Sequence, residues 1–138
     1  MKQELILPLI STMFALAAFV FSLIAFLTKR KDYRKELTYR MLLDLNSLFV
    51  QQFEKVFITG KEKNFTPIQS VHAALNINFI ESVYRMKLQN DSFLKPAILS
   101  LLELYHSWYE ENKQFYSLDF QSYVDKQYAF ILKSKNDQ

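Results

Sequence analysis

Two histidines are the best candidates for acid–base or metal chemistry in this chain, which has no cysteine. His106 has Glu103 three residues before it and Glu110 four residues after it, so all three side chains share one helical face. Glu-x-x-His is the ligand spacing of carboxylate-bridged metal bundles, but those sites need the motif on two helices. This chain contains it once, and His72 has no acid at a helical offset. We expect a surface His–Glu pair, with no metal and no other cofactor.

The residues needed for other enzyme chemistry are also scarce. No serine lies in a Gly-x-Ser-x-Gly elbow, and one glycine cannot form a Gly-rich phosphate loop. The absence of cysteine excludes a redox motif, a thiolate zinc site and a disulfide-stapled fold. Small helical-bundle ribonucleases often carry Arg followed four to six residues later by His. No histidine falls in that window after Arg30, Arg34, Arg40 or Arg85. We expect no enzyme, with a nuclease site built from several protomers as the remaining enzymatic alternative.

The first fifth of the chain is almost free of charge and indicates a membrane anchor. Leu5–Leu27 is a run of 23 residues without a charged side chain. A helix of that length spans roughly 34 Å, enough to cross a hydrocarbon core of about 30 Å. The alternative is a cleaved signal peptide, which has a shorter apolar region preceded by positive charge. Because only Lys2 precedes the run, we predict an uncleaved, single-pass anchor over residues 1–28.

Basic residues follow the predicted anchor directly and set its orientation. This basic cluster comprises Lys29, Arg30, Lys31, Arg34 and Lys35. The positive-inside rule then places the N-terminus outside and residues 29–138 in the cytoplasm. We expect a cell-membrane protein, which in a bacterium means the inner membrane. The cluster could also bind anionic lipid headgroups, at about 1 kcal/mol per residue, although fixing the topology is a sufficient role for it.

Small residues recur along the predicted span at spacings of three and four. This small-residue stripe comprises Pro8, Ser11, Ala15, Ala18, Ser22 and Ala25. Membrane helices associate where small residues let backbones approach and hydroxyls bond across the contact, and the 3-4 alternation suits left-handed packing. The stripe therefore predicts self-association. In a narrower version, several copies form a ring and Ser11 and Ser22 line a lumen. Tight packing without a lumen, or the general abundance of Ala and Ser in anchors, would explain the same residues.

The sequence predicts an all-α fold, an N-terminal transmembrane helix that continues into a cytoplasmic bundle of about four helices. One glycine and three prolines are too few for an all-β chain. Neither residue type occurs between Leu9 and Thr59, and apolar residues continue at helical spacing past the anchor. We expect one helix over about residues 4–58, followed by a short loop at 61–64. A break at Thr28–Asp32 is the alternative.

Caps and apolar spacing predict three further helices. Thr66-Pro67-Ile68-Gln69 is a capping box with proline at the first helical position. A third helix follows a cap in residues 89–92 and runs from Phe93 or Pro96 to near Phe115. A fourth begins near residues 117–119, and we expect the tail at 133–138 to fray. The expected core faces are, in order, Ile68, Val71, Leu75, Phe79, Val83 and Met86; Ile98, Leu101, Tyr105 and Trp108; and Phe120, Val124, Tyr128 and Ile131.

Aromatic residues are abundant enough to fill the core of a small bundle. A stripe of them is expected at the seam between helices, with a groove for a partner as the alternative. It comprises Tyr105, Trp108, Tyr109, Phe115, Tyr116, Phe120 and Tyr123. The net charge of +3 is too small for a dedicated nucleic-acid binder, so we expect no direct nucleic-acid binding.

Two segments, Asn78–Lys87 (NFIESVYRMK) and Phe120–Asp125 (FQSYVD), together with Trp108, resemble widespread uncharacterised bacterial families. Those proteins have one N-terminal span and an all-helical cytoplasmic domain. The layout is also similar to the small membrane accessory proteins of type VI CRISPR loci. That group is regarded as divergent relatives of helical-bundle ribonucleases that assemble into membrane pores and strengthen antiviral defence. The second resemblance implies oligomerisation and membrane permeabilisation rather than RNA cleavage.

The leading hypothesis is therefore a non-enzymatic, homo-oligomeric, single-span membrane protein. Its most specific form is a pore that perturbs the cell membrane during antiviral defence or stress, with copies of itself and membrane lipid as partners. The alternative is a membrane-anchored adaptor, monomeric or dimeric, that recruits a cytoplasmic protein through the third and fourth helices of the bundle.

Overall fold

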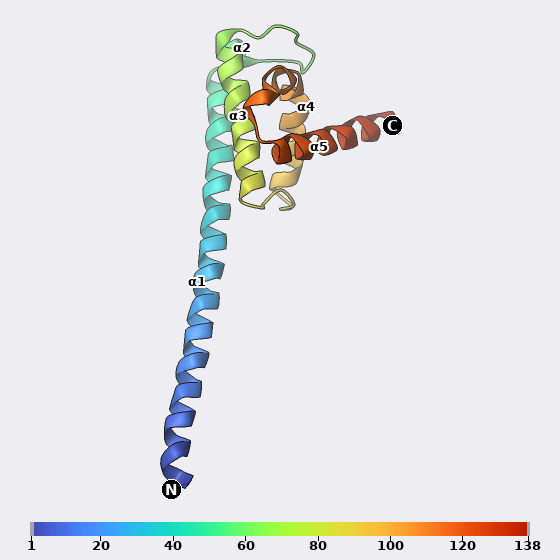
Figure 1. The fold of residues 1–138 in the computed structure, drawn as a ribbon. Helices are drawn as coiled ribbons and strands as arrows, with labels where there is room; N and C mark the ends of the chain where they lie inside the picture. Colours follow the sequence, from blue (N-terminus) through green and yellow to red (C-terminus); the bar gives the residue numbers. More distant parts are fainter. Residues whose placement is uncertain (1, 138) are drawn as a thin grey trace. The chain divides into compact units, whose positions relative to one another are not determined.

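The computed structural model of the chain is all-α, which confirms the predicted fold class (Figure 1). It describes residues 2–137, with side chains from Leu16 onward. Within this range the elements are α1 (Lys2–Gln51), α2 (Phe53–Val56), α3 (Pro67–Arg85), α4 (Leu94–Asn112), the 3₁₀ turn η1 (Lys113–Phe115) and α5 (Leu118–Asn136). The chain divides into two compact units, Met1–Leu37 and Thr38–Gln138.

The first unit consists of the N-terminal part of α1. Every side chain described from Leu16 to Arg34 is exposed. The large apolar ones among them are exposed by 46–73% and comprise Leu16, Phe19, Val20, Phe21, Leu23, Ile24, Phe26 and Leu27. In the part of the chain that the structure describes, no helix has a stretch both long and apolar enough to cross a membrane.

Helix α1 is helical at every residue from Lys2 to Gln51, so the alternative break at Thr28–Asp32 is absent. The helix ends seven residues earlier than expected. Gln52 leaves helical geometry (φ −117°, ψ 19°), and Phe53–Val56 forms the separate single turn α2. This change of direction places Val56 and Ile58 in the core, where 0% and 3% of their surfaces remain exposed. The expected end at residue 58 was wrong because tertiary burial, rather than the helical spacing of the sequence, ends the helix.

The capping box at the start of α3 is confirmed. Thr66 Oγ1 accepts a hydrogen bond from Gln69 N at 3.3 Å, and Gln69 Oε1 accepts one from Thr66 N at 2.9 Å. The loop before this cap is longer than the four residues expected, because it begins after the C-cap of α2 at Phe57. Gly60 lies in this loop with φ +81°, and a Cβ atom there would lie 3.0 Å from the backbone oxygen of Glu103 in α4.

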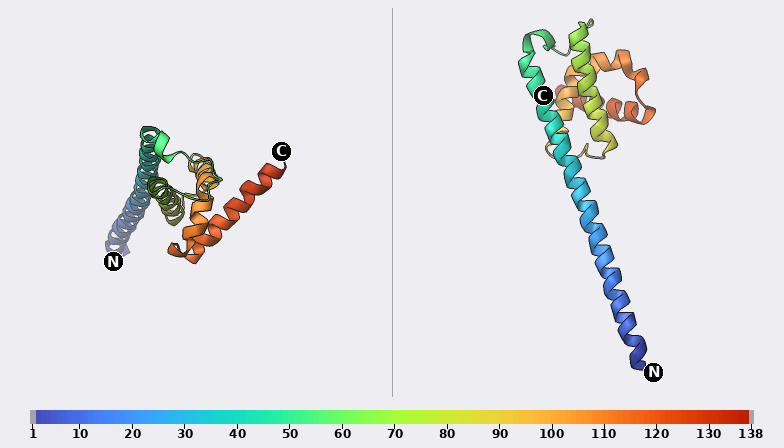
Figure 2. Two further views of the ribbon diagram at one scale, coloured as in Figure 1. Left: turned by 90° about the horizontal axis from the view of Figure 1, so that it is seen from above. Right: turned by 90° about the vertical axis from the view of Figure 1, so that its left-hand side faces the viewer.

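Helix α3 lies between the C-terminal part of α1 and α4 (Figures 1 and 2), and among the described helices it contributes the most buried residues. Its buried residues are His72, Ala73, Asn76, Ile77, Phe79, Ile80 and Val83. The predicted core face was therefore wrong at Val71 and Leu75, which are 58% and 40% exposed. The buried face is rotated because α3 packs between α1 and α4, and it takes the polar His72 and Asn76 with it. Asn76, for example, enters the core by donating to the backbone oxygen of His72 at 2.8 Å.

Helix α5 begins at its predicted cap, whereas the N-cap of α4 is Phe93, one residue after the predicted range, and its side chain makes no capping hydrogen bond. Asp91 Oδ1 accepts hydrogen bonds from the backbone nitrogens of Phe93 and Leu94, and Ser117 Oγ accepts one from Phe120 N. Helix α4 buries Leu94, Ile98, Leu102, Tyr105 and Tyr109, whereas the predicted Leu101 and Trp108 are only half-buried. The buried residues of α5 are Phe120, Val124 and Ile131, as predicted, and Tyr128 is half-buried.

The expected fraying of the C-terminal tail was wrong, because α5 continues to Asn136. Near this end of the helix, Lys135 forms an ion pair with Glu103 of α4. The contact joins residues far apart in the sequence, so the polar composition of the tail gave no sign of it.

Candidate functional site

The predicted small-residue stripe is only partly described. The side chains of Pro8, Ser11 and Ala15 lie outside the described residues. Ala18, Ser22 and Ala25 are exposed along α1. Because these side chains are short, they leave room for another helix to approach closely.

The basic cluster follows on the same helix. Lys29, Arg30, Lys31 and Arg34 are exposed, and Lys35 is half-buried. Thr28, just before the cluster, donates its hydroxyl to the backbone oxygen of Ile24 at 2.9 Å, an i−4 bond that satisfies the hydroxyl without a solvent partner. A threonine bonded in this way is compatible with either an aqueous or an apolar environment. The charged groups of the basic cluster that follow it are accessible to anionic groups.

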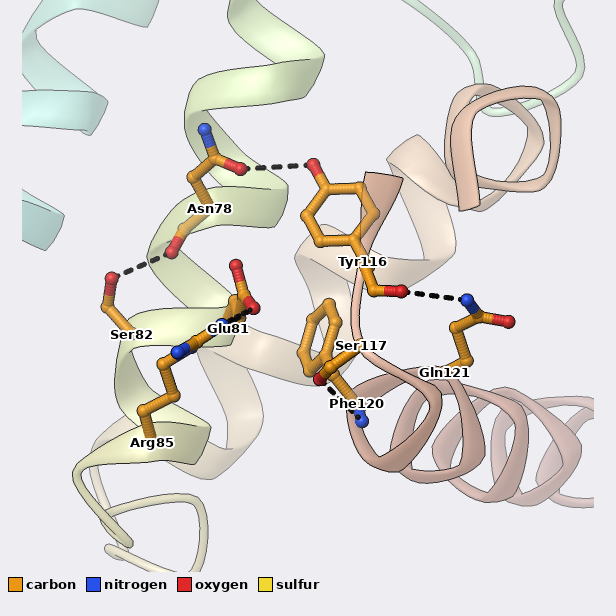
Figure 3. Close-up of polar contacts among 8 residues, drawn as sticks. All are labelled: Asn78, Glu81, Ser82, Arg85, Tyr116, Ser117, Phe120 and Gln121. Atoms are coloured by element: carbon orange, nitrogen blue, oxygen red, sulfur yellow. Dashed lines mark hydrogen bonds and ion pairs between the residues drawn. The ribbon is translucent and has the colours of Figure 1, made fainter. Parts of the chain in front are cut away.

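Segments 78–87, at the end of α3, and 120–125 of α5 meet in space, which the sequence did not predict. The ring of Tyr84 in α3 stacks on Tyr123 of α5 with centroids 4.8 Å apart, and it lies 5.8 Å from Phe120. Beside these rings is a set of polar contacts, here termed the Tyr116 cluster (Figure 3). It comprises Asn78, Glu81, Ser82, Arg85, Tyr116, Ser117, Phe120 and Gln121.

Tyr116 joins α3 to the start of α5. Its hydroxyl donates to Asn78 Oδ1 at 3.0 Å (Figure 3). Burial, together with the nearby charge of Glu81, raises the pKa of Tyr116 to about 12, so the phenol remains a donor at neutral pH. Gln121 Nε2 then donates to the backbone oxygens of Tyr116 and Lys113, both at 2.9 Å. These bonds fix the turn between α4 and α5 against α3.

The charged groups of the cluster are paired within α3. Arg85 donates to Glu81 Oε1 from Nη2 at 2.6 Å and from Nε at 3.1 Å, and Ser82 donates to the backbone oxygen of Asn78 at 2.9 Å. The side chains of Glu81, Ser82 and Arg85 are thus engaged with groups of their own helix, while Tyr116 bonds across to α3. The geometry of the Tyr116 cluster therefore serves helix packing.

The predicted pair of His106 and Glu110 is present. His106 Nε2 lies 3.5 Å from Glu110 Oε1, and the imidazole stacks on Tyr128 of α5 with centroids 3.4 Å apart. Burial lowers the pKa of His106, and the charges of Glu110 and Asp125 oppose this shift without reversing it. Glu103 turns away to its ion pair with Lys135. Among the described residues, no three His, Asp or Glu side chains gather as metal ligands.

His72 lies inside the bundle rather than on its surface. Only 3% of it is exposed, and Nε2 lies 3.1 Å from Gln52 Oε1, just where α1 ends. Nδ1 is buried without a hydrogen-bond partner. Burial lowers the pKa of His72, so the neutral imidazole is the form that fits this position.

The aromatic stripe forms the seam of α3, α4 and α5, as predicted, with one exception. Tyr105, Tyr109 and Phe120 are buried, and Trp108, Tyr116 and Tyr123 are half-buried. Phe115 was wrongly assigned, because 78% of it is exposed at the end of η1. The helical spacing that placed it in the stripe stops at Asn112, where α4 ends.

An apolar hollow of about 270 Å³, here termed the α1/α3 groove, was also missed by the sequence analysis. Its lining residues are Met41, Asp44, Leu45 and Leu48 from α1 and Leu75, Asn78, Phe79 and Ser82 from α3. Asp44 is the one charged residue among them. The sequence analysis placed Leu75 in the core, but Leu75 lines the groove instead. An apolar residue on the exposed face of α3 is therefore the sequence signal that could have located the groove.

Comparisons of the chain with models of known protein families, with curated proteins and with solved structures find no match. Conclusions about function therefore depend on the residues and on their placement.

Proposed function

We propose that this chain is a homo-oligomeric, single-span membrane protein. The observation that carries the proposal is the uncharged run Leu5–Leu27 followed at once by the basic cluster. The length of the span is taken from the sequence, because the side chains of residues 5–15 lie outside the described ones. Exposed Phe, Leu and Ile side chains along Leu16–Leu27 support it, because apolar surface of this density is unfavourable in water.

The proposed orientation has the N-terminus outside and the helical bundle in the cytoplasm. In this arrangement the basic cluster lies at the cytoplasmic surface, where it retains the bundle on that side and contacts anionic lipid headgroups. The cell membrane is then the location of the protein, and lipid is its first partner.

Self-association through the small-residue stripe is the second part of the proposal. Lipid gives no hydrophobic gain for helix pairing, so helices meet where short side chains permit close packing. The most specific form is a pore that perturbs the membrane in antiviral defence or stress, with Ser11 and Ser22 toward the lumen. The resemblance in layout to the accessory proteins of type VI CRISPR loci supports this form.

Dye uptake by expressing cells tests the pore. Ser22→Leu should reduce uptake, because a bulky apolar side chain would obstruct either the lumen or the helix contact. Phe26→Leu, which lies off the stripe, is the matched control and should retain uptake. If Ser22→Leu assembles normally and dye entry is unchanged, the pore must be abandoned.

The alternative function is an adaptor that recruits a cytoplasmic protein. It is favoured by two apolar side chains near the start of α5, Phe115 and Leu118, which are 78% and 80% exposed. Large apolar side chains gathered in this way often mark a protein contact. Leu118→Asp should abolish partner recruitment while membrane location is retained. If the protein functions without a cytoplasmic partner, Leu118→Asp should leave its function unchanged, which would contradict the adaptor.

A further inference from the structure

The turn between α3 and α4 exposes cations and one large apolar side chain. We term it the lysine turn, which comprises residues 86–95. Lys87 and Lys95 are exposed, and Phe93 between them is 56% exposed. The one acidic residue in this range, Asp91, is half-buried and accepts a hydrogen bond from the backbone nitrogen of Phe93 at 3.0 Å. The carboxylate is thus engaged with the protein, while both ammonium groups are accessible from solvent.

Lys87 occupies a backbone position that favours glycine. Among the described residues it is the one non-glycine residue with a left-handed backbone, at φ +57°. It ends α3 in a Schellman motif, in which Leu88 N donates to Val83 O and Lys87 N donates to Tyr84 O, both at 3.0 Å. Glycine would adopt this conformation with less strain. The lysine therefore supplies a side chain that the turn itself does not require.

The lysine turn lies beside the point where α1 enters the bundle. Thr38 begins the second compact unit. The next residue, Tyr39, donates its hydroxyl to the two carboxylate oxygens of Asp91 at 3.0 and 3.1 Å, and its ring meets that of Phe93 edge-on with centroids 5.0 Å apart. Leu27, the last residue of the uncharged run, precedes Thr38 by eleven residues, and eleven helical residues rise roughly 16 Å. The chain thus attaches the proposed span to the end of the bundle that carries the lysine turn.

We propose that the lysine turn binds anionic phosphate headgroups of the bilayer in which α1 is anchored. This inference rests on the proposed membrane span, and it adds to the basic cluster a second lipid contact that lies on the bundle itself. Lys87 and Lys95 attract the headgroups, and the exposed ring of Phe93 adds apolar contact in the interfacial region.

The short tether identifies the partner as lipid of the same membrane. A surface joined to its ligand by a short chain meets that ligand at a high effective concentration, so a few weak contacts are sufficient for binding. Two lysines and one aromatic ring would not hold a free bundle on a vesicle, but they can hold a bundle that the span already retains there.

Energy transfer in reconstituted vesicles tests this contact on the full chain, which has no cysteine of its own. Ser92→Cys, at an exposed position of the lysine turn, carries the donor dye, and a headgroup-labelled lipid is the acceptor. Transfer should increase when phosphatidylglycerol replaces part of the phosphatidylcholine. High salt should reverse the increase, because it screens exposed charges.

Charge variants in this labelled background assign the response to the lysine turn. Lys87→Gln/Lys95→Gln should lower the equilibrium constant for docking about 25-fold, because each lysine at an anionic surface contributes about fivefold. The matched control Lys61→Gln/Lys63→Gln removes the same charge from two exposed lysines in the loop at the opposite end of α3 (Figure 1), and it should keep the response.

Lys87→Gly separates lipid binding from a structural role of the lysine. It should weaken docking about fivefold, while the temperature of thermal unfolding stays equal or rises because the left-handed strain is removed. A lysine with only a structural role would give a lower unfolding temperature and unchanged docking.

Two results would overturn the inference: transfer that does not depend on phosphatidylglycerol, and equal loss of the response in the two double variants. Flotation with neutral phosphatidylcholine vesicles separates this failure from failure of the proposed function. A chain that floats but shows no response to phosphatidylglycerol would keep the membrane span and lose the lysine-turn contact. A chain that does not float would lose both.

Discussion

At the scale of single residues, the placement of Gly60 and of His72 depends on tertiary contacts that the sequence does not display. Gly60 has a left-handed backbone and lies against the backbone of α4, and His72 is buried next to Gln52. Nothing in the local sequence around Gly60 indicated its close approach to Glu103. The sequence gave no sign that His72 would enter the core, because a lone histidine on a helix is compatible with either face. Both positions yield predictions at this scale.

Gly60→Ala should destabilise the protein by about 1–3 kcal/mol. A side chain at φ +81° is strained, and the added Cβ atom would lie 3.0 Å from a backbone oxygen that cannot move independently. Thermal unfolding in detergent, followed by circular dichroism, measures the loss. The neighbouring exposed Lys61→Ala should stay within about 0.5 kcal/mol of the wild type. Equal unfolding curves for the two variants would contradict the close approach to α4.

Acid should weaken the fold through His72. The ordinary pKa near 6.5 applies to the unfolded chain, and burial lowers the pKa in the folded state. As the pH falls below about 6.5, the unfolded chain binds a proton that the folded chain does not. The free energy of unfolding should therefore decrease as the pH falls below about 6.5. Above that pH, His72 should contribute no pH dependence to the free energy of unfolding.

His72→Leu isolates this contribution. Its stability should fall less steeply between pH 6.5 and 5.5 than that of the wild type, whatever its absolute stability. His106→Phe keeps an aromatic ring against Tyr128 and serves as the comparison, because burial lowers the pKa of His106 in the same direction. If His72→Leu retains the full wild-type slope, the buried neutral imidazole is not its source.

At the scale of elements, helix starts could be predicted from the sequence and helix faces only partly. Thr66, Asp91 and Ser117 each accept a hydrogen bond from a backbone nitrogen three positions away at a helix start, so local chemistry determines these contacts. The rotation of α3 depends on α1 and α4 packing on two of its sides, which local spacing does not encode. The Tyr116 cluster likewise joins residues 38 positions apart.

A pair of alanine substitutions tests the rotation of α3. Ile77→Ala removes a fully buried side chain and should cost about 2–5 kcal/mol. Val71→Ala, at a residue that sequence spacing assigned to the core, should cost less than about 0.5 kcal/mol because 58% of Val71 is exposed. Unfolding in denaturant compares the two directly. Equal losses would mean that Val71 is covered in the folded protein.

At the scale of the whole molecule, the chain consists of an apolar helix followed by a helical bundle that leaves apolar surfaces exposed. The all-α class followed from composition and spacing, because one glycine and three prolines leave few alternatives. The α1/α3 groove did not, since a face is recognised as unpartnered only when its neighbours are in place. Membrane attachment and self-association are proposed for the same reason: both would cover side chains that a single chain leaves exposed.

The mass of the detergent-extracted protein tests the central claim most directly. Full-length chain should stay with the membrane fraction in alkaline carbonate and leave it only in detergent. Light scattering coupled to size exclusion should then give a protein mass several times the 16.4 kDa of one chain. Release into carbonate, or a detergent complex containing a single 16.4 kDa chain, would contradict the account.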